Sequence, residues 1–142
     1  MRPTAALSEV MAGDGPALAL LMARGIALGR VALGVVATLA PAAAARFQFG
    51  SARPALTIAV RMLGARDLAL GVGVLLAARH GSTQLRGWVE AGALADGVDA
   101  AAFVQWGRRA GARAPGLTAL VATTAAACGT WAARHLGDSH ER

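Results

Sequence analysis

The chain has 142 residues and a formal net charge of +6, and 56% of its residues are hydrophobic whereas 15% are charged. Soluble domains average about 45–50% hydrophobic and about 25% charged residues, so the composition favours a single membrane domain over a soluble one. All 14 basic residues are arginines, scattered without a basic run or interleaved aromatic residues, which argues against a nucleic-acid partner and favours an anionic membrane surface.

The first predicted transmembrane helix covers residues 18–40, follows a polar N-terminal tail and ends before Pro41. A helix of about 20 residues is long enough to cross a hydrocarbon core of about 30 Å. Arg30 lies near its middle, and Ala27 and Gly34 flank it on the same helical face. Small residues on such a face allow a second helix to approach closely.

The second apolar block covers residues 55–78, yet it contains Arg61, Arg66 and Asp67 near its middle. A charge at the centre of a transmembrane helix costs about 2.5–3.5 kcal/mol, whereas each Leu, Ile or Val returns only about 0.3–0.6 kcal/mol. This helix alone would therefore insert poorly, and it needs partners for its charges in neighbouring helices.

The third block covers residues 85–106 and has Asp96 and Asp99 near its middle. Trp88 and Trp106 are 18 residues apart, so on a helix they stand about 27 Å from each other. That separation is close to the hydrocarbon thickness and predicts an aromatic belt at the two membrane surfaces.

The fourth block covers residues 115–136, and short Gly, Pro and Arg-rich connections separate the four blocks. Residues 1–142 are thus predicted to form one all-α membrane domain, an antiparallel bundle of four transmembrane helices with short loops. Arg86 and Glu90 are four residues apart and are expected to form a surface pair. A soluble helical domain is the open alternative, since charges interrupt the apolar runs.

The charged residues of the first three helices are expected to meet at mid-bilayer in one buried, electrically balanced site. Its predicted members are three aspartates, Asp67, Asp96 and Asp99, and three arginines, Arg30, Arg61 and Arg66. Asp96 and Asp99 share a face, so one of them is expected to hold a proton unless an arginine lies between them.

Glycines flank Asp67 at positions 64 and 71, on the face where a neighbouring helix would pack. Arg66 and Asp67 diverge by about 100° around a helix, so we expect them not to pair with each other. Arg66 is expected to reach another helix, and Asp67 a different partner.

The segments GR at 29–30, RMLGARDLALG at 61–71 and DGVDA at 96–100 resemble an uncharacterised bacterial family of small four-helix membrane proteins, a domain of unknown function. The resemblance covers most of residues 24–136. It implies a multi-pass protein of the bacterial inner membrane and supplies no activity.

Three kinds of function fit this pattern. Sequestered carboxylates suit acid/base chemistry on a lipophilic small molecule, such as epoxide opening, isomerisation or cyclisation, with aspartates as catalytic groups and arginines as electrostatic or substrate-binding groups. Arg–Asp pairs could instead zip helices or the protomers of a homo-oligomer together in a non-enzymatic assembly or scaffold subunit. Ligand or proton transport is the third alternative.

No cofactor or metal site is expected. The single cysteine, Cys128, excludes an intrachain disulfide and a CxxC redox or zinc motif. The histidines show no metal-ligand spacing with a carboxylate on one helix.

Overall fold

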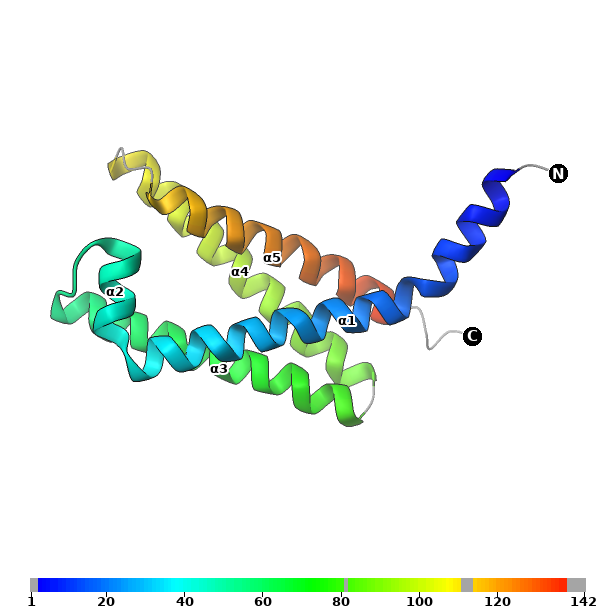
Figure 1. Cartoon of the computed structure of the whole chain (residues 1–142), viewed down its shortest axis with the longest axis horizontal. Helices are drawn as coiled ribbons and strands as arrows, with labels where there is room; N and C mark the ends of the chain where they lie inside the picture. Colours follow the sequence, from blue (N-terminus) through cyan, green and yellow to red (C-terminus); the bar gives the residue numbers. More distant parts are fainter. Residues whose placement is uncertain (1–2, 81, 111–113, 138–142) are drawn as a thin grey trace.

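The computed structural model describes residues 3–80, 82–110 and 114–137, with side chains described for residues 15–80, 84–108 and 118–136. All secondary structure in these ranges is helical, which confirms the all-α class (Figure 1). The five helices are α1 (Pro3–Leu39), α2 (Pro41–Phe49), α3 (Pro54–His80), α4 (Ser82–Ala110) and α5 (Ala114–Gly137).

The four long helices form two antiparallel pairs. Helix α1 packs most extensively on α3, and α4 packs most extensively on α5. Figure 1 shows the two helices of each pair side by side and running in opposite directions. The pairs meet through contacts of α1 with α5 and of α3 with α4. The charged residues of α1, α3 and α4 therefore have a common interface at which to meet.

The short helix α2 is a difference from the sequence prediction, which placed a connection between Pro41 and Pro54. Pro41 suits the first position of a helix, where no backbone N–H is needed, and the four alanines that follow are strong helix formers. The helix ends at Gly50, whose φ of 68° is left-handed and whose N–H donates to the carbonyl of Arg46 at 2.8 Å. A run of alanines thus turned an expected loop into a helix.

The N-terminal segment also differs from the prediction, because α1 is helical from Pro3 rather than preceded by a polar tail. Ala, Leu, Met and Glu dominate residues 5–12, and these residues favour helix even where the segment is polar. The other predicted blocks lie wholly inside α3, α4 and α5.

Among the described residues, one helical segment, Gly15–Leu39 of α1, is long and apolar enough to cross a membrane. Only 28% of its most apolar stretch is buried inside the protein. A bundle of four transmembrane helices is therefore not confirmed by length and composition, although the four long helices are present.

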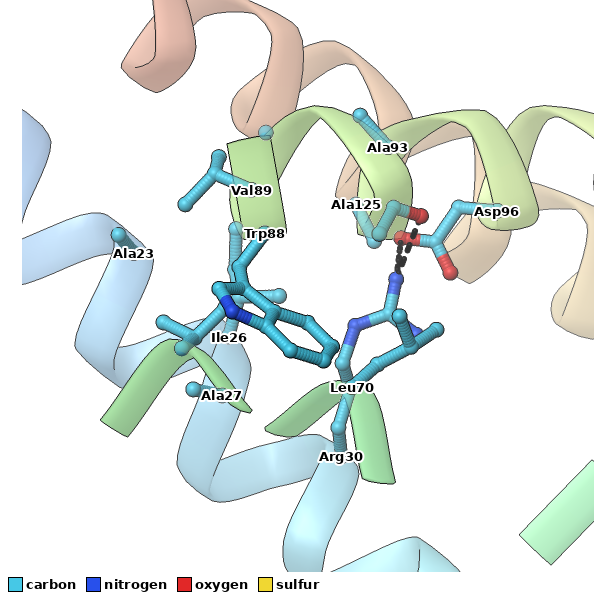
Figure 2. A pocket seen from close by; sticks show the side chains of 13 residues that line it. Ala23, Ile26, Ala27, Arg30, Leu70, Trp88, Val89, Ala93, Asp96 and Ala125 are labelled. Atoms are coloured by element: carbon cyan, nitrogen blue, oxygen red, sulfur yellow. Dashed lines mark hydrogen bonds and ion pairs between the residues drawn. The ribbon is translucent and has the colours of Figure 1, made fainter. Parts of the chain in front are cut away.

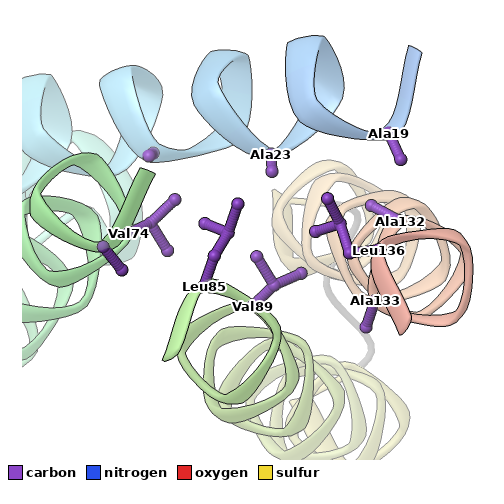
Figure 3. Close-up of a cluster of buried hydrophobic side chains, with 10 residues drawn as sticks. Ala19, Ala23, Val74, Leu85, Val89, Ala132, Ala133 and Leu136 are labelled. Atoms are coloured by element: carbon purple, nitrogen blue, oxygen red, sulfur yellow. The ribbon is translucent and has the colours of Figure 1, made fainter. Parts of the chain in front are cut away.

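The buried core holds many small residues, and many large apolar residues are exposed. The core where α1, α3, α4 and α5 converge is rich in alanine (Figure 3), including Ala19, Ala23 and Ala132. By contrast, Leu39 is 78% exposed and Leu94 is 71% exposed. The outer surface of the described helices is therefore rich in large apolar side chains.

Helices α1 and α3 approach closely because small residues face each other. A Cβ atom added to Gly34 would lie 2.7 Å from the carbonyl oxygen of Gly64, and one added to Gly71 would lie 2.7 Å from that of Ala27. Real side-chain atoms do not approach so closely, so glycine is required at these contacts. The small-residue faces predicted around Arg30 and Asp67 are thus the faces that meet.

Trp88 and Trp106, the two tryptophans of the predicted aromatic belt, both contact other residues of the protein and are both partly exposed. Trp88 lies against Gly73, where an added Cβ would meet the indole ring at 2.5 Å. Trp106 contacts Phe49 edge-on, with ring centroids 5.5 Å apart. The aromatic belt remains a prediction, since these contacts are compatible with either environment.

Candidate functional site

The guanidinium of Arg30 joins three helices. From α1 its Nη1 donates to Oδ1 of Asp67 on α3 at 3.0 Å. Its Nη2 donates to Oδ2 of Asp96 at 2.6 Å and to the carbonyl of Gly92 at 2.7 Å, both on α4 (Figure 2). Arg30 is only 8% exposed. An arginine this deeply buried needs such charge-assisted hydrogen bonds to offset the loss of water.

Arg66 makes a second junction between α3 and α4. It binds Asp99 through two parallel hydrogen bonds, Nη1 to Oδ1 at 3.1 Å and Nη2 to Oδ2 at 2.6 Å. This bidentate geometry is the strongest form of an arginine–carboxylate pair. Arg66 therefore reaches another helix, as its position in the sequence predicts.

One prediction about Arg66 is wrong. Its Nη2 also donates to Oδ1 of the adjacent Asp67 at 3.1 Å. The angle of about 100° between neighbouring residues applies to the Cα–Cβ directions, whereas the guanidinium lies at the end of a long flexible stem. The guanidinium of Arg66 can therefore reach Asp67, whose side chain points toward the same interface.

Together these contacts form one continuous chain, which we call the Arg–Asp network. It runs in the order Asp96, Arg30, Asp67, Arg66 and Asp99, with opposite charges alternating throughout. Asp67 occupies the centre because its Oδ1 accepts from both arginines. Five of the six residues predicted for the site are thus brought together.

The sixth residue, Arg61, is not brought to the network. It is exposed on α3 and forms no ion pair among the described residues. Its separation of six residues from Asp67 places it on a different face of the helix. The network therefore holds two arginines against three aspartates, a formal charge of minus one when all five are ionised, instead of the balanced set predicted.

The two carboxylates expected to repel are held apart by different arginines. Asp96 pairs with Arg30, and Asp99 pairs with Arg66. No single arginine contacts both carboxylates, so the predicted arrangement, with an arginine between them, is not the one found, and the expected shared proton stays a prediction.

The local sequence explains why the network forms at this level. In the antiparallel α1/α3 pair, Arg30 lies opposite Asp67, between the close contacts made by the flanking small residues. On α4, a Cβ atom at Gly92 would come within 3.2 Å of Nη2 of Arg30. A glycine one turn before Asp96 thus opens the space through which the guanidinium enters.

Burial changes along the network. The side chains of Arg30 and Asp96 are 9% and 12% exposed, whereas that of Arg66 is 32% exposed. The Nε of Arg66 is nevertheless buried and has no hydrogen-bond partner among the described residues. One end of the network is sealed inside the protein, and the other end reaches its surface.

A cavity of about 20 Å³ borders the sealed end, between Arg30, Asp96 and Trp88 (Figure 2). This volume admits a water molecule but not a lipophilic substrate. Within the described residues, no group of three His, Cys, Asp or Glu side chains could hold a metal ion.

Two features of the site could not be named from the sequence. The carbonyl of Gly92 is a backbone acceptor that no residue type reveals. Trp88, expected only at a membrane surface, also lines the cavity beside Arg30. Both contacts depend on how α4 is rotated against α1.

No protein-family model, curated protein or solved structure matches the chain. The resemblance to small four-helix membrane proteins stays a prediction, and the function has to be inferred from the geometry of the site.

Proposed function

We propose that the protein is a small multi-pass protein of the bacterial inner membrane, in which the Arg–Asp network fastens two helix pairs in a non-enzymatic assembly or scaffold subunit. The observation that carries this proposal is the pairing itself. Each aspartate of the network accepts a hydrogen bond from an arginine, and three helices meet there.

The distribution of side chains supports a lipid environment. Large apolar residues point outward from all four long helices, as Leu33, Met62, Leu94 and Leu120 illustrate, each at least 63% exposed. Soluble proteins rarely expose contiguous apolar patches larger than a few hundred Å². In a bilayer the same residues would face lipid, and alanines and glycines would form the helix contacts.

Two of the charges of α3 are paired inside the protein, which lowers the cost of placing this helix in a membrane. Every 18-residue stretch of α3 contains three or more charged residues, so composition alone excludes this helix as a span. Arg66 and Asp67, however, both belong to the network. Paired charges facing the interior of a bundle are the form in which intramembrane ions are tolerated.

The space around the carboxylates favours fastening over catalysis. An enzyme acting on a lipophilic molecule needs a pocket of roughly 300 Å³ or more beside its acid and base. The cavity bordering Arg30 and Asp96 is about 20 Å³, which is far smaller than such a pocket.

Replacing Asp96 with Asn tests this proposal, with Glu90→Gln as the matched control on the same helix. A fastening role predicts that Asp96→Asn lowers the amount of folded protein in carbonate-washed membranes, because Arg30 loses its shortest ion pair. Glu90 belongs to an exposed pair, so its variant should accumulate normally. Normal accumulation of both variants would contradict the proposal.

Acid/base chemistry is a second candidate, favoured by the third carboxylate of the network. Three aspartates share two arginines, and Asp67 and Asp99 are each 24% exposed at the open end. A carboxylate in excess of its counter-ions can exchange a proton. Turnover of a lipophilic epoxide by the reconstituted protein, lost in a well-folded Asp99→Asn variant, would establish this function instead.

A further inference from the structure

An aromatic cluster ties α2 to the end of α4. Phe49, the last residue of α2, stacks on Phe103 with ring centroids 6.1 Å apart and meets Trp106 edge-on at 5.5 Å. Figure 1 places α2 at the end of the molecule where α1 ends and α3 begins, the end toward which α4 also runs. Two residues of this cluster, Phe49 and Trp106, form one wall of a groove.

The groove has a volume of about 460 Å³ and is lined by Phe49, Ser51, Arg53, Leu56 and Trp106. That volume lies within the range of about 300–1,000 Å³ typical of small-molecule sites. The left-handed turn at Gly50 leads the chain from Phe49 to Ser51 and Arg53, so one turn supplies both an apolar wall and two polar groups.

Arg53 is the charged residue of the groove, and no carboxylate among the described residues pairs with it. Its side chain is exposed and forms no ion pair among the described residues. No Asp or Glu occurs in residues 15–66 or 100–137, the stretches from which α2 and the walls of the groove are drawn. Arg46 and Arg108, on α2 and near the end of α4, add positive charge at this end of the helices. The groove is therefore electrostatically complementary to an anion.

The distance of the groove from the Arg–Asp network along α4 is the distance from mid-bilayer to a membrane surface. Trp106 follows Asp96 by ten residues, which is about 15 Å along α4, or half of a hydrocarbon core of about 30 Å. If the Arg–Asp network lies at mid-bilayer, the groove lies at the level of the lipid head groups.

We infer that this groove binds the phosphate head group of an anionic membrane lipid. Arg53 and Ser51 donate to the phosphate oxygens, since a guanidinium matches a phosphate with two parallel hydrogen bonds. Phe49, Leu56 and Trp106 contact the start of the acyl chains. The inference rests on the proposed membrane location, and it adds a specific lipid site that the network does not require.

The test is lipid retention measured by native mass spectrometry of the protein released from neutral detergent micelles containing phosphatidylglycerol or phosphatidylcholine. The wild type should retain phosphatidylglycerol in preference. Arg53→Gln should lower that preference about fivefold, the effect of one arginine near an anionic membrane surface. Arg61→Gln, which removes another exposed arginine from α3 outside the groove, is the matched control and should preserve the preference.

A second variant separates the groove from general attraction to basic residues. Ser51→Trp leaves the charge unchanged but fills the groove, so it should reduce phosphatidylglycerol retention as Arg53→Gln does. Equal effects of Arg53→Gln and Arg61→Gln, or undiminished retention by Ser51→Trp, would each overturn the inference. Purification of the wild type without detergent would instead overturn the proposed membrane location, and the lipid site with it.

Discussion

Arg30 on α1 and Arg66 on α3 share one oxygen of Asp67, at 3.0 Å and 3.1 Å. The two guanidinium groups would repel each other across this short distance without the carboxylate between them. Asp67 is thus the residue through which the two halves of the Arg–Asp network are joined.

Asp67→Asn should be among the most destabilising single substitutions in the protein. It leaves Arg30 and Arg66 without the negative charge between them, although each keeps one aspartate partner, and the loss of these charged hydrogen bonds should cost about 1.5–3 kcal/mol. Unfolding in mixed detergent micelles, followed by circular dichroism, would measure the loss. Glu90→Gln should change stability by less than about 1 kcal/mol, because its ion pair is half exposed.

Arg66 and Asp99 should be energetically coupled. A double-mutant cycle with Arg66→Ala and Asp99→Ala is expected to give a coupling energy of about 1–3 kcal/mol, since the pair is bidentate and partly buried. The same cycle on Arg86 and Glu90 should give about 0.3–0.5 kcal/mol. Equal values for the two cycles would mean that the Arg66–Asp99 pair contributes no more than a surface contact.

Gly64→Ala should destabilise the α1/α3 contact. The new Cβ would lie 2.6 Å from Cβ of Ala37 and 3.0 Å from the carbonyl oxygen of Gly34, so the helices would have to separate. Overpacking of this kind costs about 1–3 kcal/mol. Thermal unfolding in detergent measures the change.

Gly97→Ala is the matched control for that substitution. Gly97 is exposed on α4 and an added Cβ there meets nothing within 4 Å. Alanine at such a helical position should stabilise the protein by about 0.5–1 kcal/mol. A similar loss of stability in both variants would show that glycine flexibility, not close approach, matters at position 64.

The pattern of small and charged residues made part of the site predictable. Residues three and four apart on a helix share a face, so Gly64 and Gly71 could be assigned to the face of Asp67 before any partner was known. The all-α class and three helix positions followed from the length of the apolar blocks and the residues that separate them.

The remaining features depend on three-dimensional relationships that a linear pattern does not contain. Arg61 fits the charge balance of the sequence but lies on another face of α3. The contact between Arg66 and Asp67 depends on the conformation of a long side chain, not on backbone angle. The helical character of residues 41–49 was masked by Pro41, which can begin a helix as readily as it ends one.

The most direct measurement of a network held at mid-bilayer is the depth of Leu94, which is 71% exposed on α4 and two residues from Asp96. A spin label at Leu94→Cys, in a Cys128→Ser background reconstituted into vesicles, should be accessible to oxygen and shielded from a water-soluble nickel chelate. A label at Gln84→Cys, ten residues or about 15 Å earlier on the same helix, should be open to the chelate. Equal access of the chelate to both labels would contradict a membrane-embedded network.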